Sequence, residues 1–282
     1  MFKILSKTAK TGLVTIDYPA VPARLPARFR GAPVFDLARW RDARPAAEAC
    51  PTGAISIEES GMTRAVRIDY GLCIYCGQCA EAEPGGAVRM SRNCELAVRD
   101  RRDLVIAAEY RIGSGGAHRE FIRSVPAERA PEKIERQVRD RIHRVLGRSL
   151  AIREVDAGSC NGCEVEITAL NNPVYDLERL GIHFVASPRH ADMLLVTGPV
   201  TRNMELALVK AYRATPDPKV VVAVGACGIS GGIFGTNYAT IGGVNRAVPV
   251  DVYIPGCPPR PHALLHGILL AVGRIEQKGL AQ

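Results

Sequence analysis

Hydrophobic and polar positions follow two different patterns along the chain. In its second half, short apolar runs of strand length alternate with longer stretches in which apolar residues recur at helical spacing. The expected strands cover residues 151–155, 193–196, 220–224 and 252–254, and the expected helices cover residues 202–213 and 261–277. Strands that alternate with helices are typical of a parallel sheet wrapped by helices. We therefore expect an α/β, flavodoxin-like domain with a doubly wound parallel sheet over residues 149–282.

The N-terminal part of the chain has a less regular pattern. Five prolines interrupt every apolar run within the first 50 residues, which indicates irregular chain there. Short strand-like segments follow at residues 54–57 and 65–68, and more strand-like sequence covers residues 96–111. These features predict a small α+β, ferredoxin-like domain over residues 1–112.

A basic linker with one helix is expected between the two domains, over residues 113–148. Apolar residues recur at helical spacing between Pro131 and Gly147, with charged residues on the other face. Such a basic helix either forms a solvated or interdomain face or docks to an acidic partner or to anionic lipid headgroups.

Composition indicates a folded protein of two domains. The 282 residues exceed the usual size of one domain, and 47% hydrophobic with 23% charged residues argues against extensive disorder. No apolar run is long enough to span a bilayer, and the N-terminal residues are too polar for a secretory signal. We therefore expect no membrane span and a place on the reducing, cytoplasmic side, where nine cysteines stay reduced.

The formal net charge of +8 does not by itself indicate a nucleic-acid partner. The positive residues are spread along the chain, and neither an aromatic platform nor zinc-finger spacing accompanies them. We expect no nucleic acid to bind. The chain also lacks a recognisable Ser/His/Asp set, phosphate loop or dinucleotide-binding glycine pattern, so we expect no self-contained substrate site.

Four cysteines follow the expected strands of the C-terminal domain. Cys160 and Cys163 come after the first strand. Cys227 follows a later strand, and Cys257 follows the last. Loops at the carboxyl ends of parallel strands gather in one crevice, so these thiols are expected to converge. Four thiolates suit Zn²⁺ or an iron–sulfur cluster, and one close pair followed by two single cysteines favours a [4Fe–4S] cluster over zinc.

A second set of cysteines lies in the N-terminal domain. Cys73, Cys76 and Cys79 form the C-x2-C-x2-C run of a bacterial ferredoxin. Cys50, which precedes a proline, is the remote fourth ligand of such a run. This set predicts another [4Fe–4S] cluster, and the ninth cysteine, Cys94, is interpreted as a spare buried thiol.

A two-cluster ferredoxin would carry four more thiols than this domain has. They would stand at positions that are occupied here by Trp40, Ala43, Ala46 and Glu83. One cluster site is therefore lost while its neighbour keeps a full set of ligands. Trp40 has a suitable size to fill the volume that the missing cluster leaves.

Two carboxylates stand beside the C-terminal cysteine pair. Glu164 and Glu166 follow Cys163 closely. Acids next to a redox centre relay protons in some proteins, but the dipole of a helix also favours acids at its N-terminus. Both interpretations, a proton relay and a structural role, stay open.

Four stretches of the C-terminal domain carry a resemblance to a known family. They read Cys-Asn-Gly-Cys-Glu-Val-Glu, Ser-Pro-Arg-His-Ala-Asp-Met-Leu-Leu-Val-Thr-Gly, Gly-Ala-Cys-Gly-Ile-Ser-Gly-Gly-Ile-Phe and Pro-Val-Asp-Val-Tyr-Ile-Pro-Gly-Cys-Pro-Pro. Together they resemble the small subunit of group 4 membrane-bound [NiFe] hydrogenases, the formate hydrogenlyase branch, over nearly all of residues 150–275. The chain is also similar to the cluster-bearing quinone-site subunit of complex I. That subunit has two adjacent cysteines in place of the spaced pair Cys160 and Cys163, which favours the hydrogenase side.

The first hundred or so residues resemble the ferredoxin-type electron-transfer subunit of the same complexes. The two resemblances imply an electron-transfer subunit that relays electrons between an N-terminal cluster, a proximal cluster and a large-subunit [NiFe] site. Implied partners are a [NiFe]-hydrogenase-like large subunit, integral membrane subunits and an electron-donor module such as formate dehydrogenase. Two alternatives remain, namely a complex I-like quinone oxidoreductase subunit and a zinc scaffold without a redox role.

Overall fold

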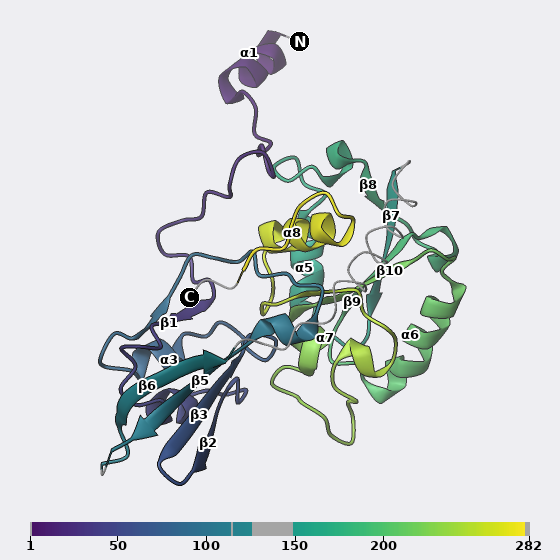
Figure 1. Cartoon of the computed structure of the whole chain (residues 1–282). Helices are drawn as coiled ribbons and strands as arrows, with labels where there is room; N and C mark the ends of the chain where they lie inside the picture. Colours follow the sequence, from purple (N-terminus) through teal and green to yellow (C-terminus); the bar gives the residue numbers. More distant parts are fainter. Residues whose placement is uncertain (1, 114, 126–148, 280–282) are drawn as a thin grey trace.

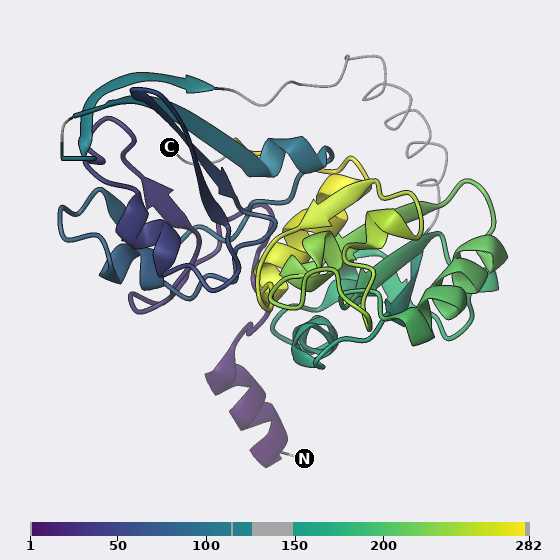
Figure 2. The ribbon, with the colours of Figure 1, turned by 90° about the horizontal axis from the view of Figure 1, so that it is seen from below.

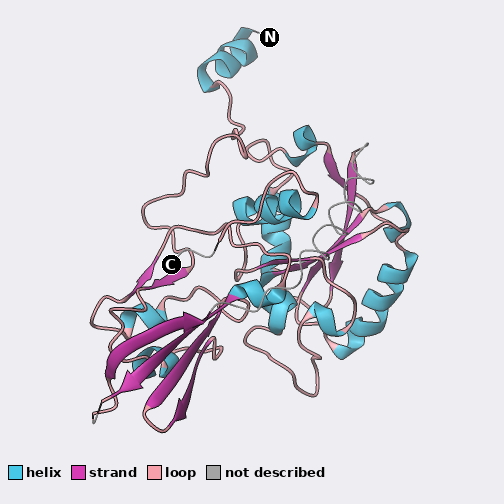
Figure 3. Ribbon diagram, viewed as in Figure 1, coloured by secondary structure: helices cyan, strands magenta, loops and turns pink. Residues whose placement is uncertain are grey.

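The computed structural model describes residues 2–113, 115–125 and 149–279, which form two halves packed side by side (Figures 1 and 2). The N-terminal half contains an antiparallel sheet, and the C-terminal half contains a parallel sheet with helices on both faces (Figure 3). This arrangement confirms the expected α/β class, with a flavodoxin-like domain beside a smaller one.

The N-terminal half is built on four antiparallel strands. Their order is β2 (Ile55–Ser60), β3 (Thr63–Asp69), β5 (Val105–Ile112) and β6 (His118–Val125). A separate two-stranded ladder pairs β1 (Pro33–Phe35) with β4 (Val88–Met90), and the helical turns are α2 (Arg44–Glu48), α3 (Gln78–Glu81) and η1 (Arg101–Leu104). β2 and β3 coincide with the two strand-like segments expected there. Their inward residues Ile55, Val66 and Ile68 are buried in the core.

The antiparallel sheet continues past residue 112, where we expected the linker to begin. The Gly113 N–H donates to the Ala117 carbonyl at 3.0 Å, and β6 pairs with β5, Phe121 opposite Tyr110. Residues 118–125 therefore extend the N-terminal sheet. The helix expected over residues 131–147 lies outside the described residues.

The C-terminal half has the strand order of a doubly wound sheet. The order is β11 (Val252–Ile254), β10 (Val220–Val224), β9 (Met193–Thr197), β7 (Leu150–Asp156) and β8 (Ile182–Phe184), and all neighbours are parallel. The chain starts in β7, adds β8 on one side and then adds the other strands on the opposite side. The order therefore reverses between β7 and β9, which is where ligands bind in open α/β sheets.

Helices cover both faces of the parallel sheet. They are α5 (Gly162–Ala169), α6 (Arg202–Ala214), α7 (Gly225–Ser230) and α8 (Pro261–Ala271), with short turns η2 (Leu177–Leu180), η3 (Pro188–His190) and η4 (Val244–Arg246). Alternate residues of β10 face opposite ways. Val222 packs in the cluster that contains α5 and α8, whereas Val221 packs in the cluster that contains Leu208 of α6.

Two expectations about helices need correction. The predicted helix over residues 261–277 ends at Ala271, because Gly273 takes the left-handed conformation at φ 69°. The start of the chain is not wholly irregular either. Residues Phe2–Thr11 form helix α1, which the first proline, Pro19, comes too late to prevent. None of its residues is buried, and it projects away from the body in Figures 1 and 2.

The two halves share backbone and side-chain contacts. Val98 and Tyr253 exchange backbone hydrogen bonds of 3.0 and 2.8 Å, which lays the N-terminal chain beside β11. Every residue of α8 is buried, and its core cluster includes Tyr18 and Ala97 of the N-terminal half. In the described part of the chain, no helix has both the length and the apolar character needed to cross a membrane.

Candidate iron–sulfur sites

The N-terminal ligand set lines a single small cavity of about 20 Å³. Cys50 follows α2, Cys73 and Cys76 lie in the loop after β3, and Cys79 lies in α3. The other walls are mainly apolar and come from β1, β2, β3 and β4. The structure thus brings the four predicted thiols together in a largely water-excluding chamber.

Local backbone geometry shapes this chamber. Gly77 takes φ 87° at the start of α3, a conformation that glycine adopts at little cost, and it turns the chain between the second and third cysteines of the run. The Ala54 N–H donates to Cys50 Sγ at 3.3 Å. The guanidinium of Arg30 donates to the carbonyl oxygen of Cys76. These contacts hold the loops around the sulfur atoms.

The thiols of this chamber are unfavourable places for isolated negative charge. Burial raises the pKa of Cys73 to about 12 and that of Cys79 to about 11, and the neighbouring thiols, Cys50 and Cys76 among them, add to both shifts. A cationic metal centre offsets both effects, because it supplies the positive charge that the buried thiolates lack.

The C-terminal ligand set comes from three loops at the carboxyl ends of the parallel strands. Cys160 and Cys163 follow β7, Cys227 lies in α7 after β10, and Cys257 follows β11. The Ala226 N–H donates to the Gly256 carbonyl at 2.8 Å, which joins the second loop to the third.

The first loop meets the other two through its second cysteine. A Cβ atom on Gly225 would lie 3.0 Å from Cys163 Sγ and 3.4 Å from the Gly256 carbonyl oxygen. Only a glycine leaves space for the sulfur at this junction. Burial, then Glu164, then the other three cysteines raise the pKa of Cys163. Burial and the neighbouring thiols of Cys257 and Cys160 raise the pKa of Cys227 to about 11. The four thiols thus influence one another electrostatically, and their convergence on one cluster stays a prediction.

A site for a single metal ion would require three or more ligand side chains close together. Across residues 2–113, 115–125 and 149–279, no three Cys, His, Asp or Glu side chains lie close enough together to hold one metal ion. A tetrahedral zinc site needs its sulfurs within about 4 Å of one another, because each Zn–S bond is about 2.3 Å long.

A half-buried acidic pair, Glu154 and Glu164, lies beside Cys163, and the sequence predicted only one of its members. Thr197 donates from Oγ1 to Glu164 Oε1, and it lies 3.5 Å from Glu154 Oε1. Burial and the charge of Glu164 raise the pKa of Glu154. Burial also raises the pKa of Glu166. The sequence pointed to Glu164 and Glu166 but missed Glu154 and Thr197, because their place at the switch point between β7 and β9 depends on strand order.

The four positions at which a two-cluster ferredoxin would carry thiols are occupied here by packed or hydrogen-bonded side chains. Trp40 is 2% exposed, its ring lies 5.2 Å from that of Phe35, and Ala43 and Ala46 are fully buried. The carboxylate of Glu83 accepts backbone N–H groups at 3.1, 2.7 and 3.4 Å from its neighbouring loop. Trp40 therefore packs in the core against Phe35, and its filling of the volume of a missing cluster stays a prediction.

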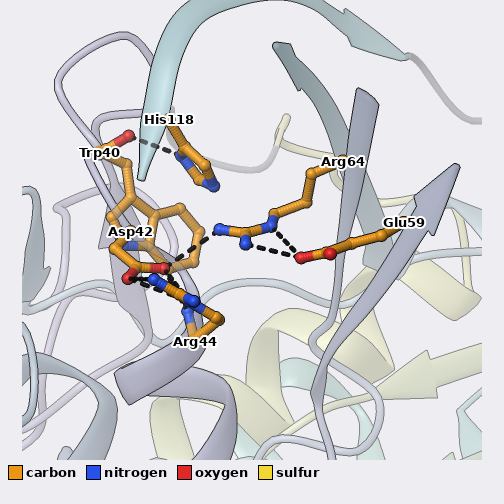
Figure 4. A network of polar contacts seen from close by, with 6 residues as sticks. All are labelled: Trp40, Asp42, Arg44, Glu59, Arg64 and His118. Carbon is orange, nitrogen blue, oxygen red and sulfur yellow. Dashed lines mark hydrogen bonds and ion pairs between the residues drawn. The ribbon is translucent and has the colours of Figure 1, made fainter. Parts of the chain in front are cut away.

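A network of polar contacts connects the segment over residues 40–44 to the antiparallel sheet (Figure 4). Arg64, which is 1% exposed, reaches Asp42 at 3.1 Å and Glu59 at 2.6 Å. His118 Nδ1 lies 2.8 Å from the Trp40 carbonyl oxygen. Ion pairs and hydrogen bonds therefore secure the segment around residue 42, where a two-cluster ferredoxin uses thiolates.

Comparison with known proteins shows the family of the C-terminal half. The model of the NADH ubiquinone oxidoreductase 20 kDa subunit family matches residues 160–271. A probable membrane-bound hydrogenase subunit of Pyrococcus furiosus is 53% identical over 133 residues, 47% of this chain and 79% of that protein. The chain belongs to the NADH ubiquinone oxidoreductase 20 kDa subunit family.

Further relatives come from two kinds of respiratory or hydrogen-linked complex. Formate hydrogenlyase subunit 7 of Escherichia coli (strain K12) is 54% identical over 47% of this chain, which spans only 52% of that subunit. An NADH-quinone oxidoreductase subunit of Citrifermentans bemidjiense is 51% identical over 41% of this chain and 68% of its own length. The 20 kDa subunit family binds iron–sulfur clusters. Its match includes all four C-terminal ligand cysteines, whereas residues 1–159 lie outside it.

Proposed function

We propose that the chain is an iron–sulfur electron-transfer subunit of a hydrogenase-like, membrane-associated oxidoreductase complex. One [4Fe–4S] cluster is held by Cys50, Cys73, Cys76 and Cys79, and another is held by Cys160, Cys163, Cys227 and Cys257. The proposed ferredoxin-like domain and the family domain are thus parts of one electron path. The substrate chemistry belongs to a partner subunit.

The observation that carries the proposal is the meeting of four thiols at the switch point of the parallel sheet. Cys163 lies against Gly225, and the loop of Cys227 is hydrogen-bonded to the loop of Cys257. This crevice is where the topology of an open α/β sheet places a bound group. An all-thiolate donor set in this crevice suits a multi-iron centre.

The chain's own residues would hold and insulate the clusters. Bound at these sites, iron–sulfur clusters supply reversible one-electron oxidation and reduction. Phe35, Ile55 and Ile68 form part of the apolar wall of the N-terminal cavity and limit access of water. Hydrogen bonds to ligand atoms, such as that from Ala54 to Cys50 Sγ, stabilise negative charge on sulfur.

The proposed partners follow from the named relatives. A [NiFe]-hydrogenase-like large subunit would exchange electrons with the C-terminal site, and integral membrane subunits would hold the complex at the cytoplasmic side of the membrane. An electron-donor module such as formate dehydrogenase would serve the N-terminal site. The relatives that support this assignment are subunits of formate hydrogenlyase and of a membrane-bound hydrogenase.

A second candidate function is that of a quinone-reducing subunit. It is supported by the 51% identity to the NADH-quinone oxidoreductase subunit of Citrifermentans bemidjiense. The purified complex distinguishes the two. Hydrogen evolution or consumption supports the hydrogenase-like function, and quinone reduction without hydrogen turnover supports the other.

The direct test of the proposed function is elemental analysis of the protein isolated without oxygen. Two four-iron clusters require about eight iron and about eight sulfide per chain. Zinc without iron would contradict the proposal and favour a structural scaffold. Iron at half this amount would show that one of the two ligand sets is empty.

A further inference from the structure

The two proposed cluster sites share a wall. Ile74 and Tyr75, which lie between two ligands of the N-terminal set, line the N-terminal thiol cavity. The same two residues also line a neighbouring pocket of about 110 Å³, which Cys257 and Pro258 line as well. The dipeptide therefore stands between the N-terminal thiols and a ligand loop of the C-terminal set.

Close packing fixes the distance between the two sites. Ser230 of α7 donates from its hydroxyl to the Gly71 carbonyl at 2.8 Å. A Cβ atom on Gly71 would lie 2.8 Å from Cγ2 of Ile229, so the absence of a side chain permits this approach. The helix that contains Cys227 thus contacts the chain two residues before Cys73.

A short segment from elsewhere in the chain also connects the two sites. Arg30 donates to the Cys76 carbonyl on the N-terminal side. On the other side, the guanidinium of Arg260 lies 4.9 Å from the centre of the Phe29 ring. Phe29, Arg30 and Arg260 all line the pocket beyond Tyr75. Phe29 and Arg30, which are adjacent in the chain, therefore contact the Cys257 loop and the Cys76 loop respectively.

Tyr75 has two features that packing alone does not require. Its backbone lies in the left-handed region at φ 58°, which is unfavourable for a residue with a large side chain. Its hydroxyl is buried, and no group among the described residues forms a hydrogen bond with it. Residues held against such preferences are concentrated at functional sites.

We propose that Tyr75 is the positioning residue of the electron path between the two clusters, with its ring filling the space between the N-terminal cavity and the Cys257 loop. This inference rests on the two-cluster function proposed above. The exchange transfers one electron, so one cluster is oxidised by one electron as the other is reduced by one. No bond forms or breaks and no proton is needed.

The experiment uses the full-length holoprotein, prepared without oxygen and partly reduced by a short photochemical pulse. Freeze-quenched samples follow the redistribution of the electron between the two clusters by electron paramagnetic resonance. We expect Tyr75→Ala to slow this redistribution severalfold while iron content and both midpoint potentials stay at wild-type values. Tyr75→Phe should restore the rate, because the hydroxyl makes no hydrogen bond and the ring remains.

A matched control is Tyr238→Ala, because Tyr238 is 92% exposed and lies in neither cavity. It should leave the rate unchanged. If Tyr75→Ala does not retain both clusters, Tyr75→Leu takes its place in the test, because leucine keeps the apolar bulk but removes the ring. Its rate should also fall below that of the wild type. Redistribution at the wild-type rate in Tyr75→Ala, or in Tyr75→Leu where the alanine variant loses a cluster, would overturn the proposal. Absence of a cluster from the wild-type protein would instead overturn the proposed function.

Discussion

At the scale of single residues, both thiol sites show the same conflict between burial and charge. Cys73 and Cys227 are placed where burial and other cysteines raise the pKa to about 12 and about 11. Metal ligation requires the deprotonated form, so binding of iron must release protons that these sites otherwise retain. Each site therefore needs all four cysteines to bind its cluster. Loss of one leaves the other three buried close together, and their negative charge is no longer fully balanced by metal.

Single cysteine replacements test the two ligand sets separately. We expect Cys257→Ala to abolish the signal of the C-terminal cluster in electron paramagnetic resonance and to leave the N-terminal signal in place. Cys94→Ser is the matched control, because Cys94 is buried but belongs to neither set. It should spare both signals. Equal loss of both signals in Cys257→Ala would show that the ligands are wrongly assigned.

A buried histidine predicts how stability depends on pH. His266 is fully buried in α8, and burial lowers its pKa from 6.5 to about 4. The unfolded chain therefore binds a proton between these two pH values that the folded chain does not bind. Folding stability should fall by about 2 kcal/mol from pH 7 to pH 5 for this reason.

The variant His266→Leu isolates this contribution. Its free energy of unfolding should decrease less than that of the wild type over the same pH interval, as measured by denaturant titration at both pH values. The variant also removes two ring nitrogens that have no hydrogen-bond partner among the described residues. An identical pH dependence in both proteins would show that His266 is protonated without unfolding.

At the scale of elements, the N-terminal segment has two parts with different roles. Helix α1 buries no residue. The strap that follows it, residues 12–18, is attached to the C-terminal half, because the Ile16 N–H donates to the Val174 carbonyl at 2.9 Å and Arg179 donates to the Tyr18 carbonyl at 2.9 Å. Tyr18 is 5% exposed and packs edge-on against His262. Stability should therefore depend on the strap and not on the helix.

Deletion and substitution test this difference. Removal of residues 2–11 should change the free energy of unfolding by less than about 0.5 kcal/mol, as expected for exposed positions. Tyr18→Ala should cost about 3 kcal/mol, because it empties a buried aromatic position. Thermal unfolding followed by circular dichroism measures both. A large loss of stability on deletion of α1 would show that the helix packs against the protein.

At the scale of the whole molecule, the two halves behave as one packed structure. Val98 bridges to Tyr253, Arg99 donates to the Leu270 carbonyl at 2.6 Å, and Ser230 donates to Gly71. These contacts join the sheet, the buried helix α8 and the ligand-bearing α7 to the N-terminal half. Separation of the halves would expose apolar residues of α8, so we expect them to unfold together.

The only tryptophan offers a local probe of this cooperativity. Trp40 lies in the N-terminal half and is 2% exposed, so its fluorescence reports unfolding there. Far-ultraviolet circular dichroism reports the whole chain, including α6 and α8. The thermal transitions measured by fluorescence and by circular dichroism should coincide. Two separate midpoints would show that the interface is too weak to couple the halves.

Patterns local in the sequence were enough to predict much of the fold and the types of ligand. Apolar runs separated by helical spacing predicted β7, β9, β10 and β11, since a buried parallel strand is apolar on both faces. Cysteine spacing predicted the N-terminal ligand set. The short strand β8 and the strand β6 escaped prediction, because their pairing depends on neighbours that the local pattern does not reveal.

The sequence by itself determined which side chains could hold metal and which segments form the parallel sheet, because ligand chemistry and hydrophobic periodicity are local properties. Only the tertiary structure decided how the two thiol sites face each other. The contacts between Gly71 and Ser230, and the place of Tyr75 in two cavities, join residues far apart in the chain. Such contacts depend on how the two folded halves fit together, which no local pattern encodes.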